Sequence, residues 1–103
     1  MEVQITLDEA LVTMRRNALS AALRNVNLHR FSSKGSSREV TEYVADRLGV
    51  YPGEIRLWLI SDGVPECYLD TFLSMLNEHS VWARYQLRPT RKLASWYLGG
   101  AHA

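Results

Sequence analysis

The stretch EYVADRLGVYPGEIRLWL, residues 42–59, decides the fold because several of its residues meet packing and turn requirements together. Gly49 stands where one helix must stop, and glycine adopts the left-handed backbone without the roughly 1 kcal/mol that a Cβ costs there. Ala45 is small enough for two helices to cross closely beside it. Ile55 and Trp58, three residues apart on the next helix, point back toward the same core. The spacing therefore predicts two short helices joined by a tight turn.

Two capping boxes predict where the helices before this stretch begin. In the first, the Thr6 hydroxyl accepts from the Glu9 amide, and apolar residues then recur at steps of three and four over about residues 7–25. The second, at Ser36, opens the first of the two helices in the motif. Between them, residues 27–37 have the sequence NLHRFSSKGSS, which is rich in serine and glycine and has no period. We expect a loop there.

After the two motif helices the pattern predicts one more helix and then changes its period. Pro65 suits the first position of a helix with a wide apolar stripe. That stripe consists of Tyr68, Leu69, Phe72, Leu73, Met75 and Leu76. From Val81 to Arg88 apolar and polar residues alternate, which favours a strand, and residues 91–98 fit a returning strand or a short helix equally well. The extension over about residues 80–98 therefore has a small β-hairpin as one alternative.

Length and composition limit the class of protein. The chain has 103 residues, which predicts a single domain over residues 1–103 with a modest core. No apolar run approaches the roughly 20 residues of a membrane span, and the start MEVQITLDEAL lacks the pattern of a secretory signal. We therefore expect a cytoplasmic protein with no membrane partner. The one cysteine, Cys67, allows no internal disulfide and reads most simply as a buried thiol.

The residues that carry enzymatic chemistry are scattered. The three histidines have no second metal ligand at helical or hairpin spacing: His29, His79 and His102. Cys67 has no identifiable partner for nucleophilic catalysis, and no glycine-rich phosphate loop is present. The sequence therefore predicts a protein that is not an enzyme, with no catalytic residues, no metal site and no cofactor.

The stretch Val44–Pro65, VADRLGVYPGEIRLWLISDGVP, resembles the phage Cro and λ-repressor-like family. That family's typical run is a helix ending in Leu-Gly-Val, a short turn, a helix with Ile or Val and then Trp, and a loop ending in Pro. The resemblance implies a mainly α helix-turn-helix domain of four to five helices, with the motif at about residues 40–60. It also implies binding to double-stranded DNA, as a homodimer on a palindromic operator.

The resemblance places the second helix of the motif in the major groove, with contacts from its start and from one turn further on. The corresponding positions here are Tyr51, Pro52, Gly53, Arg56 and Leu57. Pro52 and Gly53 offer no side-chain hydrogen bond to a base, and Leu57 could only pack on a thymine methyl. Arg56 could bind guanine through two hydrogen bonds, and Tyr51 could donate to a phosphate or a base.

Other polar and aromatic residues have expected roles around this helix. The expected phosphate contacts are Lys34, Ser37, Arg38 and Thr41. Two further basic groups are either solvated surface or additional phosphate contacts: Arg15, Arg16 and Arg24, and then Arg88, Arg91 and Lys92. The expected dimer interface is Trp82, Tyr85, Trp96 and Tyr97, although these aromatic residues could instead cover the domain's own core.

Two functions therefore stay open. The first is a sequence-specific transcriptional regulator, such as a repressor, of phage or mobile-element type. The second is a protein-interaction module derived from the same scaffold, such as a phage-encoded inhibitor or an antitoxin, in which Leu57 and Ile60 face a protein partner. The motif geometry favours the regulator. The net charge of only +1 and the apolar residues at the reading positions favour the interaction module.

Overall fold

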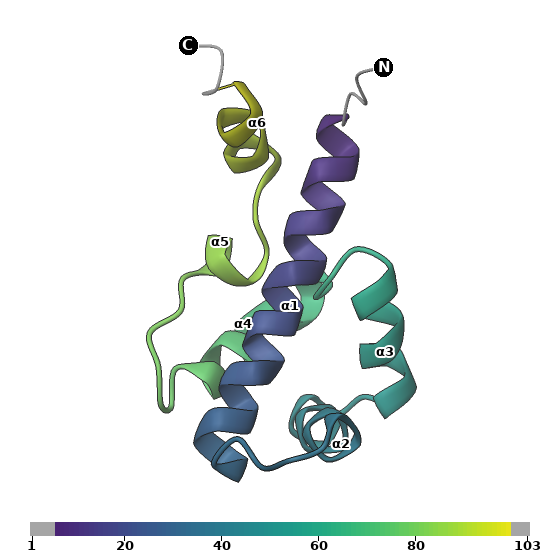
Figure 1. The fold of residues 1–103 in the computed structure, drawn as a ribbon, viewed down its shortest axis with the longest axis vertical. Coiled ribbons are helices and arrows are strands. Elements are labelled where there is room, and N and C mark those ends of the chain that lie inside the picture. Colours follow the sequence, from purple (N-terminus) through teal and green to yellow (C-terminus); the bar gives the residue numbers. More distant parts are fainter. Residues whose placement is uncertain (1–5, 100–103) are drawn as a thin grey trace.

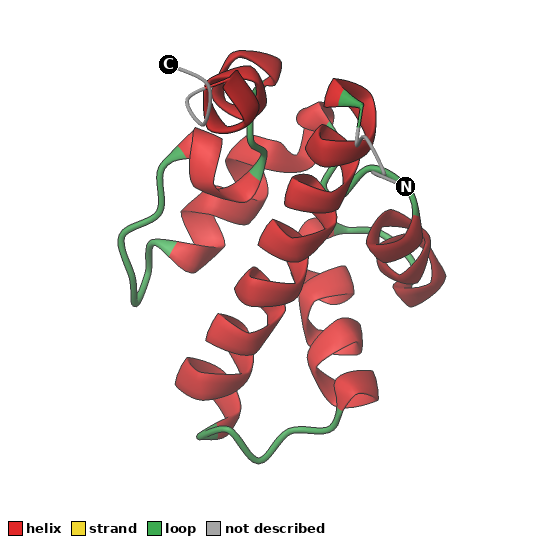
Figure 2. Ribbon diagram, turned by 45° about the horizontal axis from the view of Figure 1, so that its top comes forward, coloured by secondary structure: helices red, strands yellow, loops and turns green. Residues whose placement is uncertain are grey.

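The computed structural model describes residues 6–99, and all regular structure within that range is helical (Figures 1 and 2). The helices are α1 (Leu7–Phe31), α2 (Ser37–Leu48), α3 (Pro52–Ile60), α4 (Glu66–Leu76), α5 (Arg84–Leu87) and α6 (Arg91–Gly99). The prediction of a mainly α fold is confirmed. The strand favoured over residues 81–88 is wrong, since residues 6–99 contain no strand, whereas the short helix that was one of two alternatives for residues 91–98 is found as α6.

Helix α1 is the axis of the molecule, and each of the other five described helices packs against it. In Figure 1 it runs along the long dimension, with α2 and α3 on one side and α5 and α6 on the other. Its inward residues are Leu11, Ala18, Leu19, Ala22 and Val26. Because a helix of 25 residues is roughly 37 Å long, α1 spans most of the 42 Å length of the molecule.

Helix α1 continues to Phe31, beyond the end expected near residue 25, so the loop shrinks to residues 32–36. The Asn27 side chain explains the short loop because it holds Gly35 from both sides. Its Nδ2 donates to the Gly35 carbonyl at 3.0 Å, and its Oδ1 accepts from the Gly35 N–H at 2.9 Å. Ser32 ends the helix in the left-handed region, with φ of 54°. The loop predicted over residues 27–37 is therefore correct only for residues 32–36, because residues 27–31 belong to α1 and Ser37 begins α2.

The turn between α2 and α3 confirms the packing predicted from the sequence. Gly49 has φ of 73° and ends α2, with its N–H donating to carbonyls of the last turn. Ala45 is buried at the crossing of the two helices, and Ile55 and Trp58 are buried beneath α3. Trp58 packs against Tyr68 of α4 with ring centroids 5.2 Å apart. This contact links α3 to the rest of the core.

Helix α4 closes that core with the predicted apolar stripe. Five of its six stripe residues are buried, and Tyr68 is half-buried: Leu69, Phe72, Leu73, Met75 and Leu76 are the buried five. Pro65 stands one residue earlier than expected, as the N-cap of the helix rather than its first helical residue.

The alternating residues 81–88 contain the single turn α5 in place of the favoured strand, and residues 91–98 take the helical alternative as α6. The alternation from Val81 to Leu87 does not correspond to one buried face, because Leu87 is fully buried whereas Val81 is almost fully exposed. The Gln86 side chain accepts from the Ala83 N–H at 2.6 Å, which closes a single helical turn. Thr90 caps α6 by accepting from the Leu93 amide. Local capping therefore outweighs the period of two, and a lone two-stranded hairpin would be marginally stable in any case.

None of the described helices combines the length and the apolar character that crossing a membrane requires.

Candidate nucleic-acid interface

The outward face of α3 is a continuous stripe that is available to a partner. By helical spacing, Gly53, Arg56, Leu57 and Ile60 fall on one side, and all four are exposed. Leu57 is 57% exposed and Ile60 is 70% exposed, although both are large and apolar. We call these four residues the α3 stripe. Since Ile55 and Trp58 anchor the opposite face, the stripe is held rigidly outward.

Arg16 of α1 fixes the C-terminal end of α3. Its Nη2 donates to the Ile60 carbonyl and its Nε to the Ser61 carbonyl, both at 2.6 Å. These bonds satisfy carbonyls that the helix end leaves unpaired and place a positive charge at the negative end of the helix dipole. Arg16 therefore directs its guanidinium to the end of α3, a role that the sequence did not predict.

The two flanks of the α3 stripe differ in charge. Arg56 lies on the same side as Leu59, which borders a groove of about 300 Å³ between α1, α2 and α3. The groove is lined by Ser20, Leu23, Arg24, Asn27, Ser37, Val40, Thr41 and Leu59. Among residues 6–99, Arg24 and Arg56 have no carboxylate partner. Glu54 lies on the opposite flank, so the side facing α2 is the basic one.

The start of α2 borders this basic flank. Ser36 and Glu39 form the predicted capping box, and Lys34, Ser37 and Arg38 are exposed around it. Arg38 donates to Glu42 at 2.9 Å, and this hydrogen bond together with the carboxylate charge raises the pKa of Arg38. Because Glu42 balances the charge of Arg38, Lys34 is more available than Arg38 to bind a phosphate.

Thr41 is placed differently from its expected role. It is only 3% exposed, and its hydroxyl donates to the Ser37 carbonyl at 2.7 Å inside α2. That hydroxyl is therefore satisfied within α2 and is not presented to a phosphate. By contrast, Tyr51 is exposed at the start of α3 and makes no capping hydrogen bond, while the neighbouring Pro52 is half-buried.

The four aromatic residues expected at a dimer interface divide into two kinds. Trp96 and Tyr97 on α6 are 74% and 72% exposed, and Tyr85 is also exposed. Trp82 is half-buried and packs against the core, and its backbone is bound by the Asn77 side chain. The first three are therefore accessible to a second molecule, whereas Trp82 covers the core of its own chain.

A partly buried ion cluster beside α3 was not predicted from the sequence. Asp62, directly after α3, accepts from Arg15 at 3.0 Å and from Arg88 at 2.9 Å. Arg88 also donates to the Val64 carbonyl, and Arg15 to the Pro89 carbonyl. The cluster therefore connects α1, the loop after α3 and the linker before α6. Arg91 pairs with Asp8 while both side chains stay exposed, so two members of the second basic group, Arg88 and Arg91, are ion-paired.

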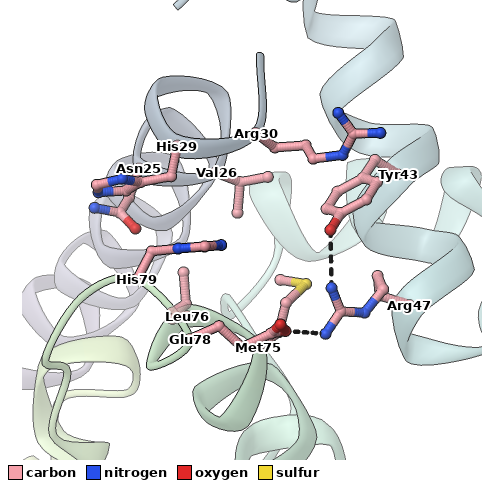
Figure 3. Close-up of a pocket in the computed structure, with 10 residues that line it drawn as sticks. All are labelled: Asn25, Val26, His29, Arg30, Tyr43, Arg47, Met75, Leu76, Glu78 and His79. Atoms are coloured by element: carbon pink, nitrogen blue, oxygen red, sulfur yellow. Dashed lines mark hydrogen bonds and ion pairs between the residues drawn. The ribbon is translucent and has the colours of Figure 1, made fainter. Parts of the chain in front are cut away.

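A second concave site lies between the ends of α1 and α4 and beside α2 (Figure 3). His29, in α1 rather than in the expected loop, stacks on His79 with centroids 5.7 Å apart. Arg47 lies between Tyr43 and Glu78 and donates a hydrogen bond to each. The bond to Glu78 has the larger effect and the bond to Tyr43 the smaller, and both raise the pKa of Arg47. The cavity has only about 30 Å³, which is room for one or two waters. It is too small for an organic ligand.

Other reactive groups do not form a site within the described range. No group of three or more His, Cys, Asp or Glu side chains between residues 6 and 99 is placed to hold a metal ion. Cys67 is exposed on α4, where a buried thiol was expected. His102 lies outside the described residues. The α3 stripe is accordingly the strongest candidate for a functional surface.

Comparison with protein-family models, with curated proteins and with solved structures finds no match to this chain.

Proposed function

We propose that the chain is a sequence-specific DNA-binding transcriptional regulator of phage or mobile-element type, with α2 and α3 as a Cro-like helix-turn-helix. In this proposal α3 enters the major groove, and two copies bind a palindromic operator. One observation carries it: a short helix, anchored by Ile55, Trp58 and Arg16, presents the exposed and uncompensated Arg56 on its outer face. Such a helix is rigid enough to position a side chain against base edges.

In this proposal some residues contact base edges and give specificity, whereas others contact phosphates and position the protein on the DNA. Arg56 would hydrogen-bond the O6 and N7 of a guanine, which contributes roughly 1 to 3 kcal/mol of discrimination. Tyr51, at the start of α3, would donate to a phosphate or a base edge. Lys34 and Ser37, beside the start of α2, would contact phosphates and set the register without reading the sequence. Arg24, across the groove from Ser37, would add to this backbone binding.

The test is selection of bound duplexes from a random DNA pool, followed by the affinity of the recovered sequence at several salt concentrations. We expect a palindromic site whose affinity falls steeply as salt increases, because binding releases counterions from the phosphates. A pool that shows no enrichment at moderate salt would contradict the proposal.

A protein-interaction module is the second candidate, and the exposure of Leu57 and Ile60 favours it. Adjacent large apolar side chains on a fixed helix also suit the groove of a protein partner. In that case Leu57→Ala would abolish complex formation with the partner, while the chain would enrich no DNA sequence.

A further inference from the structure

We infer that Leu57 and Ile60 recognise the methyl groups of neighbouring thymines in the major groove, and that Gly53 lets the start of α3 approach the bases closely. This inference rests on the proposed function and names the sequence that the site would select. It starts from a glycine that the fold itself does not require.

Gly53 differs from the glycines that the backbone requires. Gly49 and Gly63 have φ of 73° and 72°, in the region that favours glycine, whereas Gly53 is not among the residues with positive φ. A Cβ built on Gly53 would meet no atom within 4 Å. Alanine would therefore fit, and it stabilises a helix better than glycine does. No contact or backbone angle in the described chain requires glycine here, and the missing side chain leaves room for a surface to come close to α3.

On the α3 stripe, the two residues that follow Gly53 toward the C-terminal end of the helix, apart from Arg56, are apolar. Leu57 follows one helical turn later and Ile60 nearly a turn after that, both exposed. The major-groove edge offers one apolar group, the C5 methyl of thymine. Leu57 and Ile60 are separated by roughly 4.5 Å along the helix axis, and successive bases of a strand by roughly 3.4 Å. The two side chains can therefore contact methyl groups on neighbouring thymines.

The charges beside the stripe favour DNA over an apolar protein surface. Arg56 belongs to the same stripe, Arg24 lines the groove between α1, α2 and α3, and Lys34 is exposed in the loop before α2. Within residues 6–99 none of these three cations is paired with a carboxylate. The apolar residues of the α3 stripe and the unpaired cations beside them are complementary to thymine methyl groups that lie beside phosphates. The half-site that fits is a guanine, for Arg56, next to a run of thymines.

The experiment uses the duplex recovered from the random pool and a matched duplex in which deoxyuridine replaces each thymine of the half-site. Deoxyuridine removes only the methyl group and keeps the base-edge hydrogen bonds. We expect affinity to fall about fourfold for each contacted thymine, as the loss of one buried methyl group predicts. Leu57→Ala should bind the two duplexes more equally, because it lacks the side chain that contacts the methyl.

The second variant, Gly53→Ala, separates folding from binding. Thermal unfolding should show equal or higher stability, while the added methyl should weaken binding to the thymine duplex at least about fivefold through steric overlap. Equal affinity of the unchanged protein for both duplexes, or undiminished binding by Gly53→Ala, would overturn this inference while leaving the proposed function standing. A pool that yields no DNA sequence would overturn both.

Discussion

Asp62 shows how much of the architecture depends on single residues that are far apart in sequence. Its carboxylate lies between Arg15 and Arg88, whose side chains are mostly buried. The neighbouring Gly63 has positive φ, and a Cβ there would lie 2.6 Å from the Arg15 carbonyl oxygen. The loop after α3 is therefore held tightly against α1 by an ion cluster and by a close backbone approach. The loop therefore fixes the C-terminal end of α3 relative to α1.

Replacing Asp62 should destabilise the fold more than its surface position suggests. Asp62→Ala would leave two mostly buried guanidinium groups without their shared carboxylate, so we expect the free energy of unfolding to fall by about 2 to 3 kcal/mol. Urea denaturation followed by circular dichroism measures this change. The matched control is Asp70→Ala, since Asp70 is exposed and pairs with the exposed Arg84, so this variant should lose less than about 1 kcal/mol. Equal losses for the two variants would contradict the structural role of Asp62.

At the scale of elements, the start of α2 depends on a reciprocal capping contact. The Glu39 carboxylate accepts from the Ser36 N–H at 3.0 Å, while the Ser36 hydroxyl accepts from the Glu39 N–H at 3.1 Å. The pKa of Glu39 is lowered below its ordinary value, mainly by the hydrogen bond from the Ser36 backbone and to a smaller extent by the hydrogen bond with the Ser36 side chain. The charged form of Glu39 is therefore favoured in the folded chain.

The capping contact should make the stability of α2 depend on pH. Because the pKa of Glu39 is lower in the folded state than in the unfolded state, its contribution is fully present above the ordinary glutamate pKa of about 4.3. It is lost as pH falls through the lowered value. The stability difference between the unchanged protein and Glu39→Ala should be largest at neutral pH and should shrink in acid. Urea denaturation of both proteins across this range measures it, and a constant difference would show that the carboxylate does not cap α2.

The elements also show what the sequence can and cannot predict. Gly49, Ala45, Ile55 and Trp58 were interpretable because each satisfies a local turn or packing requirement. The partners of Arg16 could not be predicted in the same way, since they lie 44 and 45 residues along the chain. The strand prediction for residues 81–88 failed because alternation over a few residues does not indicate which side chains become buried. Function was harder still, because the α3 stripe has only one hydrogen-bonding side chain.

At the scale of the whole molecule, α6 carries more apolar surface outward than inward. Ala94 is buried against the body of the protein, whereas Trp96 and Tyr97 are exposed on the outer side. In Figure 1, α6 lies at the end of the molecule opposite α2. A symmetric pair joined through α6 would leave the α3 stripe of each copy uncovered. This arrangement is compatible with the proposed dimer on a palindromic site.

The α6 aromatic residues should affect association without affecting the fold. The double substitution Trp96→Ala and Tyr97→Ala should weaken dimerisation at least tenfold, because Trp and Tyr are enriched among the interface residues whose loss costs about 2 kcal/mol or more. Its unfolding transition should be nearly unchanged, since both side chains are largely exposed. Sedimentation equilibrium without DNA measures the association. Trp82→Ala is the opposite control and should lower stability, as Trp82 packs on the core. A monomeric unchanged protein would contradict the proposed dimer.

The central claim, that α3 reads bases through Arg56, is tested most directly by measuring Arg56→Ala against every single-base variant of the recovered operator. Lys92→Ala removes an equal charge from α6, away from α3, and serves as the control. We predict that Arg56→Ala loses roughly 1 to 3 kcal/mol of discrimination at one guanine position and keeps its preferences elsewhere. Lys92→Ala should retain every base preference. An equal loss of affinity for all sequences in Arg56→Ala would contradict the account, because it would show that Arg56 contacts the backbone and reads no base.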